Sequence, residues 1–401
     1  MEIISRKHYA SRVDSWLGKG LIIVLTGQRR VGKSYVLKDF AARHSAEPGS
    51  NIIYLDKEKK EYADIGTCKE LDAFIASRFR RDRRNYILVD EVQEIEAFEK
   101  SLRNWRTEEH TDIIVTGSNS DMLSGDLATL LAGRYEEIRI QALSYSEFLV
   151  FHGLEDSDAA LQKYLEVGGL PGLRDIGLDN GEHVWDYLQS ILNTVMLKDV
   201  IERHDIRNLP FLNNLVRFYA DNIGKLNSAS SISKYMKHQG ENVSTNVVLA
   251  YAGYYAEACL LDIVPRYDIH GKKRLESNEK VYFGDIGLRN LLAGGNREHD
   301  IEKIIENVVY QHLVRLGFRV AAGQLRVGEV DFVCEKPGGK AYVQASYLVG
   351  SDETRDREFG NLEKIGDNYP KYVVSMSPLL ESRDYNGIIH LSLRKFLREG
   401  I

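Results

Sequence analysis

The first chemical signal in the sequence is a glycine-bounded loop, Gly27-Gln28-Arg29-Arg30-Val31-Gly32-Lys33-Ser34, with the pattern G-x-x-x-x-G-K-[ST]. Its glycines permit backbone angles that a β-carbon would forbid, so the N–H groups can turn inward around a polyphosphate. Lys33 is then placed to reach the β- and γ-phosphates, and Ser34 to ligate Mg²⁺. We therefore expect ATP or ADP with Mg²⁺, held by Gly27, Gln28, Arg29, Arg30, Val31, Gly32, Lys33, Ser34 and Tyr35.

Two carboxylates, Asp90 and Glu91, follow the apolar run Tyr86-Ile87-Leu88-Val89. In open α/β sheets, ligands bind beyond the carboxyl ends of the strands. Asp90 is expected to bind Mg²⁺ through water, and Glu91 to polarise the attacking water as general base. Alone, the pattern also suits a strand that runs into a turn, but the glycine loop upstream favours the catalytic interpretation.

Two further candidates remain open from the sequence. Ser118 or Asn119, at the end of the apolar run from Asp112, could hydrogen-bond the γ-phosphate or the water, or could be an ordinary polar strand end. Arg134 could stabilise charge that develops in the transition state. It could equally be one of the exposed arginines that are common on protein surfaces.

These residues must be positioned by a regular framework, and the sequence predicts one. Expected strands at 21–26, 51–56, 86–90, 112–117 and 136–140 alternate with helical segments. This alternation predicts an α/β fold with a parallel sheet and right-handed crossovers, in which the nucleotide lies across the strand ends.

Composition narrows the class of protein. The chain has 401 residues and a formal net charge of −6, so no overall basic field indicates nucleic acid. Cys68, Cys259 and Cys334 are far apart, which argues against a disulfide framework or a zinc site and favours a cytoplasmic setting. We see no apolar run long enough for a membrane span and expect no membrane partner.

Several motifs together carry a resemblance to a known family. They are Gln28-Arg29-Arg30 in the glycine loop, Val89-Asp90-Glu91-Val92-Gln93, Thr116-Gly117-Ser118, Ala132-Gly133-Arg134, Leu143-Ser144-Tyr145-Ser146-Glu147-Phe148, Gly168-Gly169-Leu170-Pro171, Lys198-Asp199 near Arg203, Gly284-Asp285-Ile286-Gly287-Leu288-Arg289 and Glu329-Val330-Asp331-Phe332. The chain resembles the AAA-type P-loop ATPases of bacteria and archaea, and more narrowly the group with an uncharacterised C-terminal domain.

The resemblance implies a division of the whole chain. It predicts an ATPase core at 1–150, a helical lid at 151–205, a winged-helix-like segment at 206–295 and a restriction-nuclease-like α/β domain at 296–401. It also implies that Ser118 or Asn119 corresponds to the first sensor, and that Arg134 corresponds to an arginine finger or sensor.

The winged-helix-like segment leaves the partner open. Two helices are expected, one capped by Ser228 and one capped by Ser244, with a turn at Gly240 between them. They precede a hairpin whose basic residues could neutralise phosphates: Arg266, Lys272, Lys273 and Arg274. The second helix offers no lysine or arginine on the face of Asn242, Thr245 and Asn246, so DNA and a protein dock both remain open. The cluster Gly168-Gly169-Leu170-Pro171-Gly172 is either an approach to adenine or a tight turn between helices.

The C-terminal domain resembles the PD-(D/E)xK nucleases through Glu306 on a helix and Asp331 on a strand. Gln344 and Ser346 stand where a second acid and a lysine would be expected. Because metal-assisted hydrolysis needs those groups, we expect a nuclease-like fold without cleavage. Glu306, Asp331 and Gln344 are then either structural polar residues or ligands of a weakly bound ion.

The resulting hypothesis is an ATP-hydrolysing AAA-type protein whose cycle moves the lid and winged segment and repositions the C-terminal domain on DNA. The alternatives are a slow ATP-dependent switch that binds DNA or a protein client, and an ATP-gated nuclease. The sequence decides neither the client nor whether the chain oligomerises.

Overall fold

The computed structural model describes residues 3–117, 131, 133–295, 300–348, 359–377 and 384–401. The chain divides into two compact units, one of residues 1–142 with 257–259 and one of residues 143–256 with 260–401. In the described ranges, no helix has the length and apolar character that a membrane crossing needs. The finer division into lid, winged segment and C-terminal domain stays a prediction.

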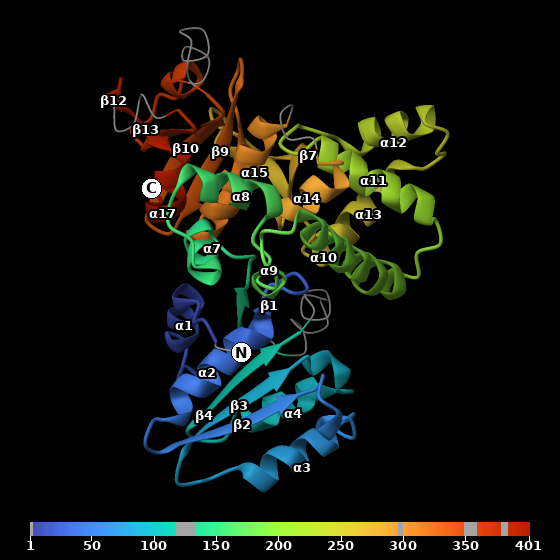
Figure 1. The fold of residues 1–401 in the computed structure, drawn as a ribbon, viewed down its shortest axis with the longest axis vertical. Coiled ribbons are helices and arrows are strands. Elements are labelled where there is room, and N and C mark those ends of the chain that lie inside the picture. Colours follow the sequence, from blue (N-terminus) through green and yellow to red (C-terminus); the bar gives the residue numbers. More distant parts are fainter. Residues whose placement is uncertain (1–2, 118–130, 132, 296–299, 349–358, 378–383) are drawn as a thin grey trace. The chain divides into compact units, whose positions relative to one another are not determined.

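The described part of the first unit contains a parallel sheet of five strands, in the order β2-β3-β4-β1-β5 (Figure 1). The strands are β1 (Ile22–Thr26), β2 (Ser50–Asp56), β3 (Arg84–Asp90), β4 (Thr111–Thr116) and β5 (Tyr135–Arg139). The predicted α/β core is therefore confirmed. Because all strands run the same way, the glycine loop after β1 and the carboxylates after β3 share one edge.

Helices cover both faces of this sheet. On one face, α3 (Cys68–Arg78) and α4 (Phe98–Trp105) bury Leu71 and Leu102 in a core with alternate residues of the strands. On the other, α2 (Lys33–Ser45) packs Phe40 edge-on against Tyr86, with ring centroids 5.3 Å apart. Alternate strand residues point to opposite faces, so Asp90, which has the parity of Tyr86, faces α2.

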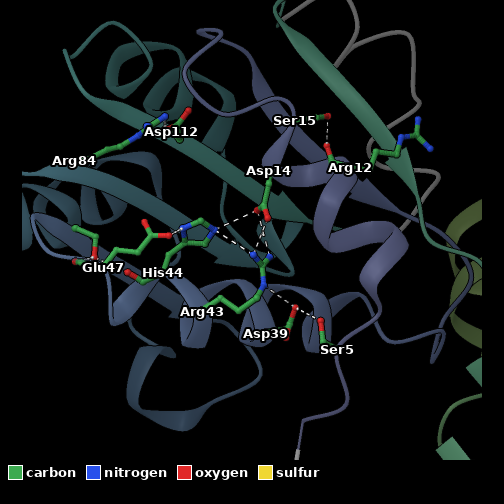
Figure 2. Close-up of polar contacts among 11 residues, drawn as sticks. Ser5, Arg12, Asp14, Ser15, Asp39, Arg43, His44, Glu47, Arg84 and Asp112 are labelled. Atoms are coloured by element: carbon green, nitrogen blue, oxygen red, sulfur yellow. Dashed lines mark hydrogen bonds and ion pairs between the residues drawn. The ribbon is translucent and has the colours of Figure 1, made fainter. Parts of the chain in front are cut away.

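A cluster of polar side chains joins α1 (Lys7–Asp14) to α2 (Figure 2). Arg43 Nη1 donates to Asp14 Oδ2 at 2.7 Å, and His44 Nε2 lies 3.2 Å from Asp14 Oδ1. Arg43 Nε and Ser5 Oγ both donate to Asp39 Oδ2, at 3.1 and 3.0 Å. Since α2 begins directly after the glycine loop, this cluster helps to fix the direction in which that helix presents its first turn.

The second unit carries helices both before and after its strands. It contains α7 (Tyr145–His152), α8 (Asp158–Val167), α9 (Leu173–Ile176), α10 (Gly181–Thr194), the π-helical segment η3 (Val195–Glu202), α11 (Leu209–Asp221), α12 (Ala229–His238), α13 (Thr245–Glu257), α14 (Ile286–Leu292), α15 (Ile301–Arg315) and α17 (Leu393–Glu399). Helix α10 continues directly into η3.

A mixed sheet of eight strands forms the rest of this unit, in the order β12-β13-β11-β10-β9-β8-β6-β7. The strands are β6 (Leu261–Asp268), β7 (Lys273–Phe283), β8 (Arg319–Gln324), β9 (Glu329–Lys336), β10 (Gly339–Ser346), β11 (Lys371–Ser375), β12 (Asp384–Tyr385) and β13 (Ile388–Ser392). The predicted hairpin is β6–β7, and β6 also pairs in parallel with β8. The hairpin is therefore the edge of the C-terminal sheet.

The Gly168-Gly169 turn is held by a buried carboxylate. Asp285 Oδ2 accepts from Gly169 N at 2.8 Å, and its Oδ1 accepts from Leu288 N at 3.1 Å. A Cβ on Gly168 would stand 2.5 Å from Asp285 Oδ1, and the φ of Gly168 is 76°, so glycine is required. Of the two interpretations left open for this cluster, these contacts favour the tight turn.

Candidate nucleotide-binding site

The glycine loop between β1 and α2 curls around the ammonium of Lys33. Its Nζ donates to Gly27 O at 2.9 Å and to Gln28 O at 3.2 Å. Gly27 has a φ of 135°, and a Cβ there would stand 2.1 Å from Ile140 O, so no other residue fits. Gly32, with a φ of 96°, leads into α2. A glycine loop, a helix N-terminus and an ammonium thus lie together, which is the composition of a phosphate site.

The remaining loop residues divide between the interior and the surface. Val31 is buried, whereas Arg30 is exposed and has a φ of 69°, which is unusual for a residue other than glycine. Tyr35 is 45% exposed, and the ammonium of Lys38 lies 5.3 Å from its ring centroid. Arg30 and Tyr35 are accessible to a bound ligand, and Val31 can contribute only its backbone.

A buried arginine that sequence reasoning missed holds the outer side of the loop. Arg6 is 5% exposed, and its Nη1 donates to Val31 O at 3.1 Å and to Gln141 O at 2.9 Å. Its Nη2 donates to Ala142 O at 3.3 Å. Arg6 therefore bonds the phosphate loop to the segment that follows β5. A single arginine before the first helix gives no periodic signal, so the sequence offered nothing to find it.

Thr116 at the end of β4 positions both candidate carboxylates. Its Oγ1 donates to Asp90 Oδ1 at 2.5 Å and accepts from Glu91 N at 3.0 Å. Glu91 has a left-handed φ of 55°, and its Oε2 accepts from Gln93 Nε2. Sequence reasoning had placed the polar role of this strand end on Ser118 or Asn119, which lie outside the described residues.

The electrostatics of Asp90 suit a cation ligand. Burial raises the pKa of its carboxyl above the usual range, hydrogen bonds from Thr116 and Ser34 lower it, and the charges of Glu91 and Asp56 raise it again. Among the described residues, Asp90 Oδ2 has no hydrogen-bond partner, although the residue is 1% exposed. A divalent cation could be coordinated by this oxygen and would stabilise the ionised carboxylate that burial disfavours. The side chains of Asp90 and Ser34 therefore fit Mg²⁺.

Strand β2 adds two residues that the sequence analysis had assigned only to a strand. Asp56, 4% exposed, pairs in register with Asp90, and Lys38 Nζ lies 3.8 Å from its Oδ2. The pKa of Tyr54 is raised by burial and then by the charges of Asp90 and Asp56. The available signal was their alternation: Tyr54 and Asp56 are polar at every second position of an apolar strand, which puts them on one face.

The structure separates Arg134 from the loop of its own chain. Arg134 is exposed, and its carbonyl accepts from Ile22 N at 3.0 Å, at the start of β1 and β5. The glycine loop follows the other end of β1, which is about 13 Å away at the usual rise of a strand. This separation argues against contact between Arg134 and a γ-phosphate held by its own loop, and its role stays a proposal.

The acidic residues singled out in the C-terminal part contact a lysine. Glu306 and Asp331 both accept from Lys280 Nζ, and Gln344 Oε1 accepts from Asp331 N at 3.1 Å. Ser346 Oγ is buried without a partner in the described ranges. No group of three or more His, Cys, Asp or Glu residues that could hold a metal ion occurs among the residues described.

A parallel sheet with a glycine loop after β1 and paired carboxylates after β3 defines a P-loop domain of the AAA type. Residues 19–149 match a family model described as "AAA domain", and residues 158–299 match one described as "Domain of unknown function (DUF8612)". An uncharacterized protein of Haemophilus influenzae is 31% identical over 393 residues, which are 96% of each chain. The chain belongs to the family of that protein, and the predicted AAA domain is confirmed.

Two further relatives extend the comparison. The uncharacterized protein MJ1544 of Methanocaldococcus jannaschii is 27% identical over 362 residues, covering 86% of this chain and 78% of that one. Among solved structures, the Walker-type ATPase PABY2304 of Pyrococcus abyssi is similar over 73% of this chain and 96% of its own, with 15% identity and a TM-score of 0.49. These comparisons do not support the nuclease-like resemblance of residues 296–401, which stays a proposal.

Proposed function

We propose that this chain binds ATP with Mg²⁺ and hydrolyses it at the edge of the first sheet. One observation carries the proposal: buried polar atoms without partners in the described structure gather on the loop and strand ends. They are both amide atoms of Gln28, Asp90 Oδ2, Gln93 Oε1 and the Tyr54 hydroxyl. Buried polar groups are almost always hydrogen-bonded, so these atoms indicate a site that a ligand and water complete.

Each residue has a defined role in this proposal. The loop amides and Lys33 bind the phosphates, and Ser34 and Asp90 hold Mg²⁺, which when bound neutralises charge on the phosphate oxygens. Glu91, positioned by Thr116 and Gln93, accepts a proton from the attacking water. Asn119 and Arg134 remain proposed as a sensor and as a charge-stabilising residue.

Calorimetry with the full chain tests the binding step. Lys33→Ala is expected to abolish the heat of ATP and ADP uptake in magnesium buffer, because it removes the ammonium enclosed by the loop. Lys69→Ala is the matched control, since Lys69 is exposed on α3. An unchanged heat in Lys33→Ala, or no heat in the wild-type chain, would refute the binding site.

Steady-state phosphate release tests the chemical step. Glu91→Gln is expected to abolish release and to spare ATP binding, because the amide cannot accept the proton. Glu94→Gln, on the same 3₁₀ turn and exposed, should release phosphate at the wild-type rate. Wild-type turnover by Glu91→Gln would show that the base has been misassigned.

We further propose that the nucleotide cycle repositions the second unit. The supporting observation is Arg6, which bonds Val31 of the loop to Gln141 and Ala142, immediately before the second unit begins at Leu143. A movement of the loop that displaces the Val31 carbonyl would therefore be transmitted through Arg6 to Gln141 and Ala142, which lead into the second unit. Slow turnover in the phosphate assay would favour the alternative of a slow ATP-dependent switch over an ATPase whose hydrolysis drives this movement.

DNA is the partner we propose for the second unit. Lys272, Lys273 and Arg274 are exposed at the turn of the β6–β7 hairpin, where they can neutralise phosphates. Arg266 contributes less, because it is bonded to Gln324. Fluorescence anisotropy with duplex DNA should show salt-dependent binding that a triple substitution of the three exposed residues weakens. No binding by the wild-type chain would leave the protein client as the better hypothesis.

A further inference from the structure

A buried ammonium lies among carboxylates in the second unit. Lys280 of β7 is 1% exposed, and its Nζ is 2.9 Å from Glu306 Oε1 of α15 and 3.1 Å from Asp331 Oδ1 of β9. Glu329 Oε1, on a side chain that is half exposed, lies 3.4 Å from the same Nζ. One point cation therefore meets one oxygen from each of three carboxylates.

The neighbouring groups hold the two buried carboxylates in place around that cation. The Tyr282 hydroxyl donates to Glu306 Oε1 at 2.6 Å, and Ala345 N donates to Asp331 Oδ2 at 3.0 Å. The cluster thus draws on α15 and on strands β7, β9 and β10. The carboxylates are thus arranged as in a cation-binding site, and the cation they surround is the Lys280 ammonium.

Charge balance explains why a cation is needed at this point. Two carboxylates buried in contact with each other would force one of them to take up a proton unless a cation is present. Burial and the charge of Asp331 raise the pKa of Glu306 to about 7, although Lys280 and Tyr282 act in the opposite direction. The Lys280 ammonium therefore favours the ionised form of Glu306, and it is shared with Asp331 and Glu329.

The neutral side chain of Gln344 is consistent with this balance between the carboxylates and the Lys280 ammonium. Gln344 and Asp331 lie on paired positions of β10 and β9, because Val343 pairs with Phe332. A carboxylate at 344 would add another buried negative charge to the single ammonium. The amide instead accepts the N–H of Asp331 and adds no charge.

We infer that the Lys280 ammonium takes the place of a divalent cation between Glu306 and Asp331. The wild-type chain accordingly binds no Mg²⁺ or Mn²⁺ at these oxygens, since the ammonium already occupies the point that both carboxylates share. Removing the ammonium opens a site for a divalent cation, because oxygen ligands of this kind are those that Mg²⁺ and Mn²⁺ take. This inference does not depend on the proposed ATPase activity.

The inference is tested by measuring Mn²⁺ uptake by the full chain. The readout is the loss of the free-ion signal in electron paramagnetic resonance. All variants carry Asp90→Asn, and no nucleotide is added, so that the first unit binds as little Mn²⁺ as possible. The parent and its Glu306→Gln derivative should take up equal amounts of Mn²⁺. Lys280→Met should take up one further ion per chain, and adding Glu306→Gln to Lys280→Met should remove it.

Each result decides the matter. Uptake by the parent that Glu306→Gln abolishes would overturn the inference, because the ion would then bind beside Lys280. A folded Lys280→Met variant without additional uptake would overturn it as well. If Lys280→Met folds only with Mn²⁺, the inference is supported, because the ion replaces the lost charge. If it fails to fold even with Mn²⁺, the inference is wrong, because the ion cannot replace the ammonium.

Discussion

Thr116→Val is the substitution that most directly tests how the site is built. Valine keeps the branched shape but removes the hydroxyl that donates to Asp90 Oδ1 and accepts from Glu91 N. A hydrogen bond to a charged group contributes about 1.5–3 kcal/mol. If that amount is lost from the positioning of the two carboxylates in the transition state, kcat falls by about 10- to 150-fold.

Thr116→Val should also give two further results that a purely structural role of Thr116 would not produce: a shifted pH–rate profile and a nearly unchanged ATP affinity. Loss of the donor raises the pKa of Asp90 further, because the bond from Thr116 lowers it in the wild-type chain. The rising limb of the pH–rate profile should therefore move to higher pH. ATP affinity should change much less than kcat, because the loop and Lys33 are untouched.

The assay is steady-state phosphate release across pH, with ATP binding measured by calorimetry on the same preparations. Thr116→Ser is the matched control, since serine keeps the hydroxyl and should retain most of the activity. Turnover of Thr116→Val within twofold of wild type would refute the reasoning. Equal impairment of Thr116→Ser would show that the hydroxyl is not the group that matters.

Three further outcomes are expected. Arg6→Gln should weaken ATP binding about tenfold or more in calorimetry, since it loses charged bonds to the loop. Arg12→Gln, at an exposed position of α1, should not; equal affinities of the two variants would contradict this. Burial lowers the pKa of His312 from 6.5 to about 3, so the unfolded chain takes up a proton at this residue at a higher pH than the folded chain. The free energy of unfolding is therefore highest above pH 6.5 and decreases as the pH falls toward 3. Urea unfolding should show a loss of up to about 5 kcal/mol that His312→Leu reduces, and an unchanged pH dependence would refute it. Arg134→Ala and Lys33→Ala should each turn over slowly, and mixing them should restore part of the activity; no recovery would argue against action between copies.

Local patterns were sufficient for much of the first unit. The glycine loop, the position of Asp90 and Glu91 and four of the five strands follow from short apolar runs and from residues adjacent in sequence. In the second unit the β6–β7 hairpin was also predicted, because alternation and a turn signal are local. Its parallel pairing with β8 was not, since the partner strand lies about fifty residues further along the chain.

The partners that complete each site were not predictable in this way. Thr116 reaches Asp90 across 26 residues, and Arg6 reaches Gln141 across 135. The contact of Lys280 with Asp331 spans 51 residues. A threonine, an arginine or a lysine on an ordinary element gives no sign of which distant group it will meet.

The sequence by itself determined which groups can bind a phosphate and where the parallel sheet presents them, because glycine freedom, strand polarity and helix direction are local properties of the chain. The tertiary structure alone decided which buried charges are neighbours: Thr116 between Asp90 and Glu91, Arg6 behind Val31, and Lys280 between Glu306 and Asp331. Strand order and helix packing determine these pairings. Since the energy of a buried charge depends on its immediate neighbours, they also determine what each site can bind.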